Sequence, residues 1–273
     1  MKPAFRVIAR LDIKDENLVK GINLEGLRVI GKPHDFANYY YQNGIDEILY
    51  QDVIASLLGR NNLKEIIAKS SKNIFVPITV GGGIKSLKDI ENVLKSGADR
   101  VSLNSGVLEN KNLIKDSIKN FGSSNIVFAI ETINLNKNYI IVKHNGRERT
   151  EFSLLDWVKL LEDYGASEIC LTSISNDGTG NGINYEILDL ISDISSISLI
   201  YHGGVNSKDP EKLKSKNYKN LSGLVISSLF HYKYYLKQNH ESNKFNNGNI
   251  EFMLKKKFQI ILNQLKLRNL KRN

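Results

Sequence analysis

"VPITVGGGIKSLKDIENVLKSGADRVSLN" occupies residues 76–104 and contains one complete strand–helix–strand pattern. Two short β-rich runs, residues 76–80 and 100–104, enclose a helix-like stretch that begins at Ser86 and reaches Ser96. Serine is a common residue at the start of a helix, because its side chain can accept a hydrogen bond from a free backbone N–H. The stretch therefore predicts a parallel β–α–β unit, with Gly81–Gly83 in the turn after the first strand.

The same alternation repeats along the chain on both sides of this unit. Most of the β-rich runs are continuously apolar, as expected of parallel strands that are buried on both faces. Eight strand–helix alternations in a chain of 273 residues predict a single (β/α)8 TIM barrel, with a doubly wound sheet as the alternative. The runs are residues 6–13, 47–53, 76–80, 100–104, 126–132, 168–174, 197–203 and 223–229, and helix-like stretches also occupy 33–43, 61–70, 154–164 and 185–195.

The two halves of the chain resemble each other. Asp12 ends the first β-rich run and Glu131 ends the fifth, while Gly82 follows the third run and Gly203 follows the seventh. An acid followed by a glycine pair thus occurs once in each half, at nearly the same spacing. This pattern indicates that the barrel consists of two half-barrel repeats.

Composition narrows the class of protein. No apolar run approaches the roughly 18 residues that a membrane-spanning helix needs, and no signal-peptide apolar region opens the chain, so we expect a cytoplasmic protein without a membrane role. The single cysteine, Cys170, excludes an internal disulfide and a multi-cysteine metal site, and it stands in an apolar run typical of a core. The histidines show no metal-ligand spacing, so no metal and no cofactor are expected.

The net charge of +9 is concentrated at the C-terminal end. Residues 232–273 hold ten Lys/Arg against two Asp/Glu, and the remaining chain holds 28 against 27. We expect one domain over 1–273, with a polar insertion at about 233–249 and a basic C-terminal helix at about 250–270. Apolar residues recur at helical spacing over 250–265, so this helix is predicted to pack as the eighth barrel helix. An RNA- or membrane-surface role is the alternative, and nucleic-acid binding is not favoured.

Reactive groups of such barrels lie at the carboxyl ends of the strands. Glycine loops there let the backbone approach an anion, so the loops at Gly82 and Gly203 predict a ligand with a phosphate at each end. Asp12 and Glu131 would face each other between them and could divide acid and base roles. A salt bridge of Asp12 with Lys14 or Lys20 is the structural alternative. Further polar residues at strand ends are Asp52, Asn104, Ser173, Asp177, His202 and Ser228.

The loop "SISNDGTGNG", residues 173–182, follows the sixth β-rich run and is long enough to cover a substrate. Asp177 and Thr179 could contact a phosphate, a ribose or a reacting group, although turn formation alone also explains the Asp–Gly and Asn–Gly pairs. His202 could donate to a phosphate or only fill space. Trp157 lies on the apolar face of its helix and is predicted to be a core residue.

Seven motifs together resemble a known family. They are "RVIARLDIKDENLVKGINLEGLR", "ILYQDVIAS", "VPITVGGGI", "GADRVSLNS", "FGSSNIVFAIE", "GASEICLTSISNDGTGNG" and "SSLFH". In this order, over about residues 5–232, they are similar to the cyclase subunit of imidazole glycerol phosphate synthase, of the HisA/HisF family. The resemblance implies a heterodimer with a glutaminase subunit, whose ammonia passes through the barrel to a bis-phosphorylated ribonucleotide. The implied products are imidazole glycerol phosphate, for histidine biosynthesis, and an aminoimidazole carboxamide ribonucleotide.

The resemblance also assigns residues. Asp12 matches the first catalytic aspartate, Glu131 stands where the second is an aspartate, and Lys20 matches a lysine near the flexible first loop. An ammonia gate at the strand starts would consist of Arg6, Glu47, Arg100 and Glu168, with Arg100 where a lysine is usual. One phosphate site would contain Gly82, Gly83 and Asn104, and the other Asp177, Gly178, Gly204 and Ser228. The chain also departs from the family pattern at Arg10, Ser175, Asn176 and His202.

These departures leave other functions open. A similar paralogue could keep the ammonia route and amidate a nucleotide-linked sugar for surface glycans. A non-catalytic barrel could scaffold a glutaminase, although acids at both 12 and 131 argue against this. The related sugar-phosphate isomerase of the same pathway fits the gate residues less well.

Overall fold

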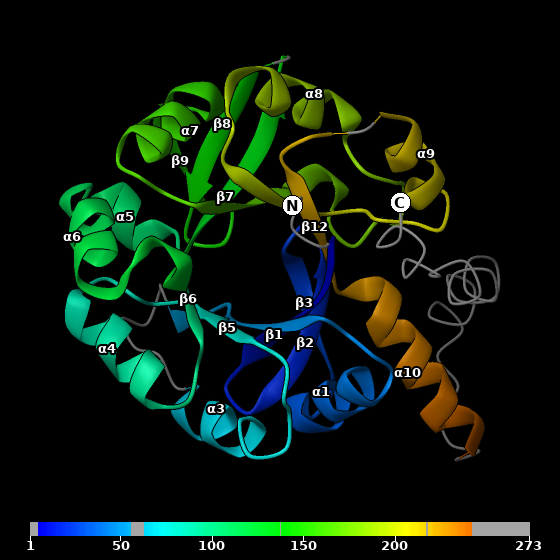
Figure 1. Ribbon diagram of the computed structural model, residues 1–273. Coiled ribbons are helices and arrows are strands. Elements are labelled where there is room, and N and C mark those ends of the chain that lie inside the picture. Colours follow the sequence, from blue (N-terminus) through cyan, green and yellow to red (C-terminus); the bar gives the residue numbers. More distant parts are fainter. Residues whose placement is uncertain (1–4, 56–62, 137, 217, 242–273) are drawn as a thin grey trace.

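The computed structural model describes residues 5–55, 63–136, 138–216 and 218–241, and it forms a closed parallel barrel (Figure 1). Neighbouring strands pair in parallel around the ring, and the pairing of β10 with β7 closes it. This closure confirms the (β/α)8 barrel and excludes an open doubly wound sheet. The barrel strands are β1 (Arg6–Lys14), β4 (Glu47–Asp52), β5 (Ile78–Gly81), β6 (Arg100–Leu103), β7 (Ile126–Leu135), β10 (Glu168–Ser173), β11 (Ser198–His202) and β12 (Leu221–Ile226).

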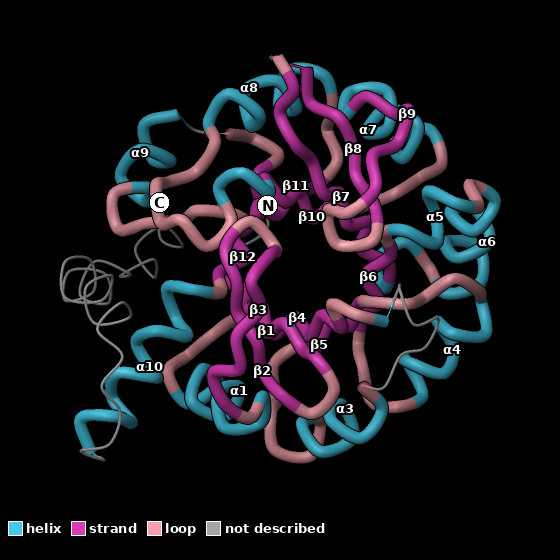
Figure 2. The backbone as a smooth tube through the Cα atoms, turned by 180° about the vertical axis from the view of Figure 1, so that it is seen from behind, coloured by secondary structure: helices cyan, strands magenta, loops and turns pink. Residues whose placement is uncertain are grey.

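The helices surround the ring of strands, as Figure 2 shows from the opposite side. They are α1 (Pro33–Gln42), α3 (Lys64–Ser70), α4 (Leu87–Lys95), α5 (Ser105–Glu109), α6 (Asn112–Phe121), α7 (Leu154–Asp163), α8 (Tyr185–Ile194), α9 (Asp209–Lys216) and α10 (Ser228–Glu241), with short 3-10 turns η1 (Ser123–Asn125) and η2 (Ile174–Asn176). Ser86 caps α4 by accepting a hydrogen bond from the Asp89 N–H, as its position in the sequence predicts. Among the described helices, none has the length and apolar character that crossing a bilayer would require.

Most of the buried apolar side chains lie in two regions of the barrel. The larger core lies between the strands and the helices and includes Trp157, which is 2% exposed. A second, smaller layer lies inside the barrel and contains Ile8, Leu49, Val127, Cys170, Ile200 and Val225. Cys170 is therefore a core residue, as predicted, and burial raises the pKa of its thiol to about 12. The inner layer separates the two polar ends of the barrel.

Each half of the barrel carries a β-hairpin after its first strand. The hairpin β2 (Asn17–Ile22) and β3 (Glu25–Gly31) extends β1, and β8 (Asn138–Lys143) and β9 (Glu148–Ser153) extend β7. The eight-run pattern does not predict these hairpins. Their equivalent placement supports two half-barrel repeats, because β1 and β7 are the first and fifth strands of the ring.

The C-terminal end differs from the prediction. After β12, helix α10 continues to Glu241, so the polar stretch expected from residue 233 begins as a helix. Tyr234 explains this, because its ring lies 4.6 Å from the rings of both Phe36 and Tyr39 on α1. Helix α10 follows β12, the eighth strand of the ring, and contacts α1. The expected basic helix at 250–270 lies outside the described residues.

Candidate active site

Asp12 and Glu131 occupy corresponding places at the carboxyl ends of the strands. Asp12 pairs with Val19 where the first hairpin begins, and Glu131 pairs with Val142 where the second begins. Both side chains are buried, with exposures of 2% and 5%. The sequence prediction that two acids face the mouth from opposite halves therefore agrees with the positions of the strands.

Asp12 is held by two cations. Arg10 Nε donates to Asp12 Oδ1 at 2.7 Å, and Lys20 Nζ lies 3.9 Å from Asp12 Oδ2. Burial by itself would raise the pKa of Asp12, but Arg10 and then Lys20 outweigh it and lower that pKa below its ordinary value. Asp12 is therefore an ionised carboxylate over the neutral pH range. The salt bridge with Lys20 that the sequence offers as an alternative is present only as a weak contact, and Arg10 is the main partner.

Lys20 makes its shorter contacts with Asp177. The Lys20 Nζ donates to both carboxylate oxygens of Asp177, at 2.9 and 3.0 Å, and both side chains are 1% exposed. His202 Nε2 lies 3.4 Å from Asp177 Oδ1. Burial, followed by repulsion from Arg10 and Lys20, lowers the pKa of His202 well below its usual value, so His202 is neutral. Asp177 thus belongs to a buried ionic network in this structure.

Glu131 has the opposite electrostatic environment. Burial raises its pKa to about 7, Arg10 opposes this rise, and the Asp12 carboxylate adds to it. Hydrogen bonds from the Gly146 backbone and the Asn104 side chain also favour the ionised form, but they do not offset burial. Two carboxylates at one site therefore have pKa values displaced in opposite directions. Such a pair can exchange protons with a ligand near neutral pH.

A pocket opens beside Glu131 over one side of the mouth. Of the predicted site residues, Gly82, Gly83, Asn104 and Glu131 line it, and Arg10 forms part of its wall. Asp12, Lys20 and Asp177 lie next to it in the ionic network, joined to the pocket through Arg10. The first predicted phosphate loop and one of the two acids thus share a single cavity.

The paired glycines adopt backbone conformations that other residues avoid. Gly82 and Gly83 have φ of 104° and 69°, and Gly203 and Gly204 have φ of 120° and 73°. A Cβ on Gly82 would lie 2.3 Å from the Asp52 carbonyl oxygen, and one on Gly203 would lie 2.6 Å from the carbonyl oxygen of Ser173. Gly82 and Gly203 therefore each pack against the last residue of the preceding barrel strand. This matching contact is a second structural sign of the half-barrel repeat.

The remaining predicted ligand residues lie on the other side of the mouth. Gly178, with φ of 75°, lies against the first hairpin, where a Cβ would meet the Gly21 carbonyl oxygen at 2.6 Å. The Thr179 hydroxyl donates to the Asn176 carbonyl at 2.8 Å, so it stabilises the turn. Ser228 begins α10, and its buried hydroxyl has no hydrogen-bond partner among the described residues. Among these three residues, Ser228 is the one with a buried side-chain polar atom that has no partner in the described part of the chain.

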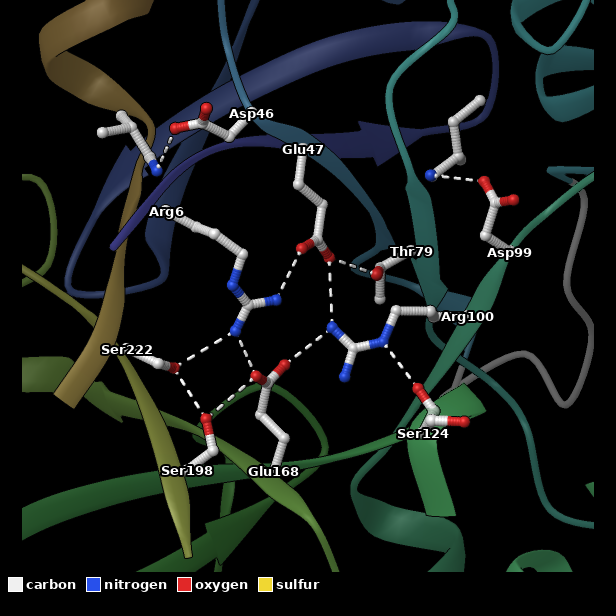
Figure 3. Close-up of polar contacts among 12 residues, drawn as sticks. Arg6, Asp46, Glu47, Thr79, Asp99, Arg100, Ser124, Glu168, Ser198 and Ser222 are labelled. Atoms are coloured by element: carbon white, nitrogen blue, oxygen red, sulfur yellow. Dashed lines mark hydrogen bonds and ion pairs between the residues drawn. The ribbon is translucent and has the colours of Figure 1, made fainter. Parts of the chain in front are cut away.

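The four predicted gate residues form a ring of ion pairs at the opposite end of the barrel (Figure 3). Arg6 contacts both Glu47, at 3.0 Å, and Glu168. Arg100 reaches Glu168 at 2.7 Å and Glu47 at 3.6 Å. Thr79 adds a hydrogen bond to Glu47 at 2.5 Å. The ring covers the inner apolar layer at the strand starts, and its members come from β1, β4, β6 and β10.

One segment at the pocket is not predicted by the sequence pattern. Asn145 and Gly146 form the turn between β8 and β9, where Asn145 lines the pocket and the Gly146 N–H bonds Glu131. The Asn–Gly pair at 145–146 is a recognisable hairpin-turn signal. Its proximity to the mouth depends on the hairpin, which the barrel pattern does not predict. Within the described ranges, no cluster of three or more His, Cys, Asp or Glu could hold a metal ion.

Known proteins are similar to this chain over most of its length. The family model described as "Histidine biosynthesis protein" matches residues 6–235. Imidazole glycerol phosphate synthase subunit HisF of Legionella pneumophila is 47% identical over 201 residues, which cover 73% of this chain and 95% of the relative. The proteins of the same name are 38% identical in Natranaerobius thermophilus and 40% identical in Clostridium botulinum, over 84% and 83% of this chain and 91% and 90% of the relatives.

Proposed function

Because the chain belongs to the histidine biosynthesis protein family, we propose that it is the cyclase subunit of an imidazole glycerol phosphate synthase. It uses ammonia to convert a bis-phosphorylated ribonucleotide into imidazole glycerol phosphate and an aminoimidazole carboxamide ribonucleotide. The main observation behind this proposal is the buried pair of carboxylates, Asp12 and Glu131, at the mouth of the barrel. The pKa of Asp12 is lowered and that of Glu131 is raised. Amidation of a nucleotide-linked sugar is not favoured, because the three relatives named above all carry the histidine-pathway name.

In this proposal, Glu131 moves the proton and Asp12 keeps its charge. With a pKa of about 7, Glu131 is partly ionised at neutral pH. The ionised carboxylate can accept a proton from the ammonia nitrogen as it adds to the substrate. Asp12 holds Arg10 and Lys20 and stabilises positive charge that develops on the nitrogen as it adds to the substrate. No metal or cofactor takes part in this scheme.

The two ends of the substrate would bind on the two sides of the mouth. One phosphate is assigned to the loop of Gly82 and Gly83, and Asn104 lines the same pocket beside Glu131, to which its side chain donates. The other is assigned to the side that contains Gly178, Gly203, Gly204 and the Ser228 hydroxyl. In this proposal the ion pair of Lys20 and Asp177 lies between the two phosphates. The Thr179 hydroxyl stabilises the loop that contains Asp177.

A glutaminase is the proposed partner, and the name "subunit" in the relatives supports an assembly of more than one chain. The ring of Arg6, Glu47, Arg100 and Glu168 is the proposed entry for ammonia. Its position at the strand starts supports this role, because a barrel that worked alone would need no charged ring at the end opposite its chemistry.

The proposal is tested by incubating the purified chain with the bis-phosphorylated substrate and an ammonium salt. Imidazole glycerol phosphate should accumulate in an enzyme-dependent manner, and addition of the glutaminase should allow glutamine to replace the ammonium salt. Tight binding of the bisphosphate without any product, in the presence of saturating ammonium, would contradict the proposed activity.

A further inference from the structure

Four buried polar atoms around the pocket have no hydrogen-bond partner among the described residues. They are Arg10 Nη2, Asn104 Oδ1, Glu131 Oε2 and Asn145 Nδ2, and all four residues line the same cavity. A buried polar atom without a partner costs about 1–3 kcal/mol. Four such atoms at one cavity indicate that a ligand supplies the missing bonds.

The four atoms come from four segments of the barrel: β1, the residue after β6, β7 and the turn between β8 and β9. Arg10 is 3% exposed, and its other nitrogens are engaged, Nε with Asp12 at 2.7 Å and Nη1 with His202 Nδ1 at 3.4 Å. Glu131 is 5% exposed and is held by hydrogen bonds from the Gly146 backbone and Asn104. The turn of the second hairpin fixes the backbone of Asn145, with φ of 58°. The unpaired atoms of Arg10 and Glu131 therefore have defined positions before any ligand binds, and the Asn145 side chain extends from a fixed backbone.

The chemical character of the four atoms specifies the ligand group. Arg10 Nη2 and Asn145 Nδ2 can only donate hydrogen bonds, whereas Asn104 Oδ1 and an ionised Glu131 Oε2 can only accept them. A phosphate offers acceptors alone and would face the Glu131 carboxylate. An ammonium group offers donors alone and would leave Arg10 unpaired. A primary carboxamide offers both, because its oxygen accepts two hydrogen bonds and its NH2 donates two.

We infer that Arg10 and Asn145 donate to, and Asn104 and Glu131 accept from, one carboxamide group of the bound ribonucleotide. This inference rests on the proposed function and adds the part of the substrate that the pocket selects. It assigns Asn145 and Arg10 as specificity residues, and it explains why a buried arginine is tolerated inside the barrel. Arg10 neutralises Asp12 through Nε and presents a second donor to the substrate.

The test compares two ligands that differ in one group. Calorimetric titration measures the binding of the aminoimidazole carboxamide ribonucleotide and of its analogue in which a carboxylate replaces the carboxamide. Ribose 5-phosphate, which has neither group, is the reference ligand. At pH 8 the carboxamide should bind at least about tenfold more tightly than the carboxylate, because the carboxylate replaces two donors by an anion beside Glu131. The preference should shrink below about pH 7, where Glu131 is protonated and can donate. The charged groups that face Glu131 are Arg10 and Asp12 of β1.

Two variants test whether Asn145 and Arg10 bind the carboxamide, and a third is a control. Asn145→Asp keeps the shape but turns the donor into an acceptor, so carboxamide binding should weaken by about tenfold while ribose 5-phosphate binding is unchanged. Arg10→Lys keeps a cation beside Asp12 but loses the guanidinium fork, and it should also reduce carboxamide binding. Asn120→Ala, at an exposed position of α6, is the matched control. Thermal melting of each variant checks that it is folded.

The outcomes separate the inference from the function. Equal binding of the two ribonucleotides by the wild-type protein, or wild-type discrimination in Asn145→Asp, would overturn the carboxamide assignment. If imidazole glycerol phosphate is still formed, the proposed function stands without it. If the wild-type protein binds no phosphorylated ligand and forms no product, both are overturned.

Discussion

Arg10 Nε donates to Asp12 Oδ1 at 2.7 Å, so a strand residue and the residue two positions further along it form a buried ion pair. Residues two apart on a strand point to the same face, which places both side chains on the inside of the barrel. Burial alone would lower the pKa of Arg10, but Asp12 and other acids outweigh it. The pair therefore stays charged in a region closed to solvent.

Removal of the Asp12 charge should stop the reaction without unfolding the barrel. We expect Asp12→Asn to lower ammonia-dependent turnover by about 10²–10⁴-fold, because the developing positive charge loses its counter-ion. Arg10 and Lys20 also lose a partner, so the melting temperature should fall by several degrees. Asp15→Asn is the control, since Asp15 is exposed in a turn with φ of 55°, which asparagine also adopts. A folded Asp12→Asn protein with more than about a tenth of wild-type turnover would contradict this role.

Glu131 should make the protein less stable as pH rises. Its pKa of about 7 in the folded state lies above the ordinary value of 4.5, so between these values the folded state binds a proton that the unfolded state has released. The free energy of unfolding therefore decreases as pH rises from about 4.5 to 7. Glu131→Gln removes this term, and its melting temperature relative to wild type should increase between pH 5 and pH 8. A pH-independent difference would show that the Glu131 pKa is not raised.

The same carboxylate should appear in the pH dependence of the rate. Ammonia-dependent turnover should rise with pH more steeply below about pH 7 than above it, because both free ammonia and ionised Glu131 increase there. Glu131→Gln should be severely impaired and should retain only the rise caused by ammonia. Glu131→Asp should be mildly impaired, because it keeps the carboxylate. Equal tolerance of both substitutions would mean that Glu131 is structural.

The sequence predicts the parts of the structure that depend on the order of strands. Asp12, Glu131 and the paired glycines lie at strand ends, so a barrel prediction also places them at the mouth. The resemblance to the family predicts the gate residues, and the ion pairs between Arg6, Glu47, Arg100 and Glu168 agree with it.

The contacts inside the site could not be predicted in this way. The family resemblance places Asp177 at a phosphate site, yet Lys20 contacts it because the β2–β3 hairpin lies next to β1. Asn145 lies at the pocket for the corresponding reason in the second half. Partner choice among buried charges depends on distances of a few ångströms between chain segments far apart in sequence. Strand order alone does not specify such distances.

Helix α10 should contribute directly to stability through its contact with α1. Phe36 is 3% exposed, and its ring lies 4.6 Å from that of Tyr234 and 5.7 Å from that of His231. We expect Phe36→Ala to lower the free energy of unfolding by about 3–5 kcal/mol, because it leaves a cavity between the two helices. Phe75→Ala serves as the control, since Phe75 is 76% exposed. Chemical denaturation measures both, and similar losses for the two variants would argue against the packing role of α10.

The charged ring at the strand starts should matter for glutamine-dependent turnover more than for ammonia-dependent turnover. Arg100 lies between Glu47 and Glu168, so Arg100→Gln leaves two nearly buried carboxylates with Arg6 as their remaining partner in the ring. The repulsion should distort the ring and the surface that the glutaminase is proposed to contact. We expect the ratio of glutamine-dependent to ammonia-dependent turnover to fall about tenfold in Arg100→Gln, and less in Arg100→Lys, which keeps the charge. Lys119→Gln, at an exposed position of α6, controls for the loss of a positive charge. If added ammonium fails to restore turnover in Arg100→Gln, the ring supports the fold of the whole barrel and is not specific to ammonia entry.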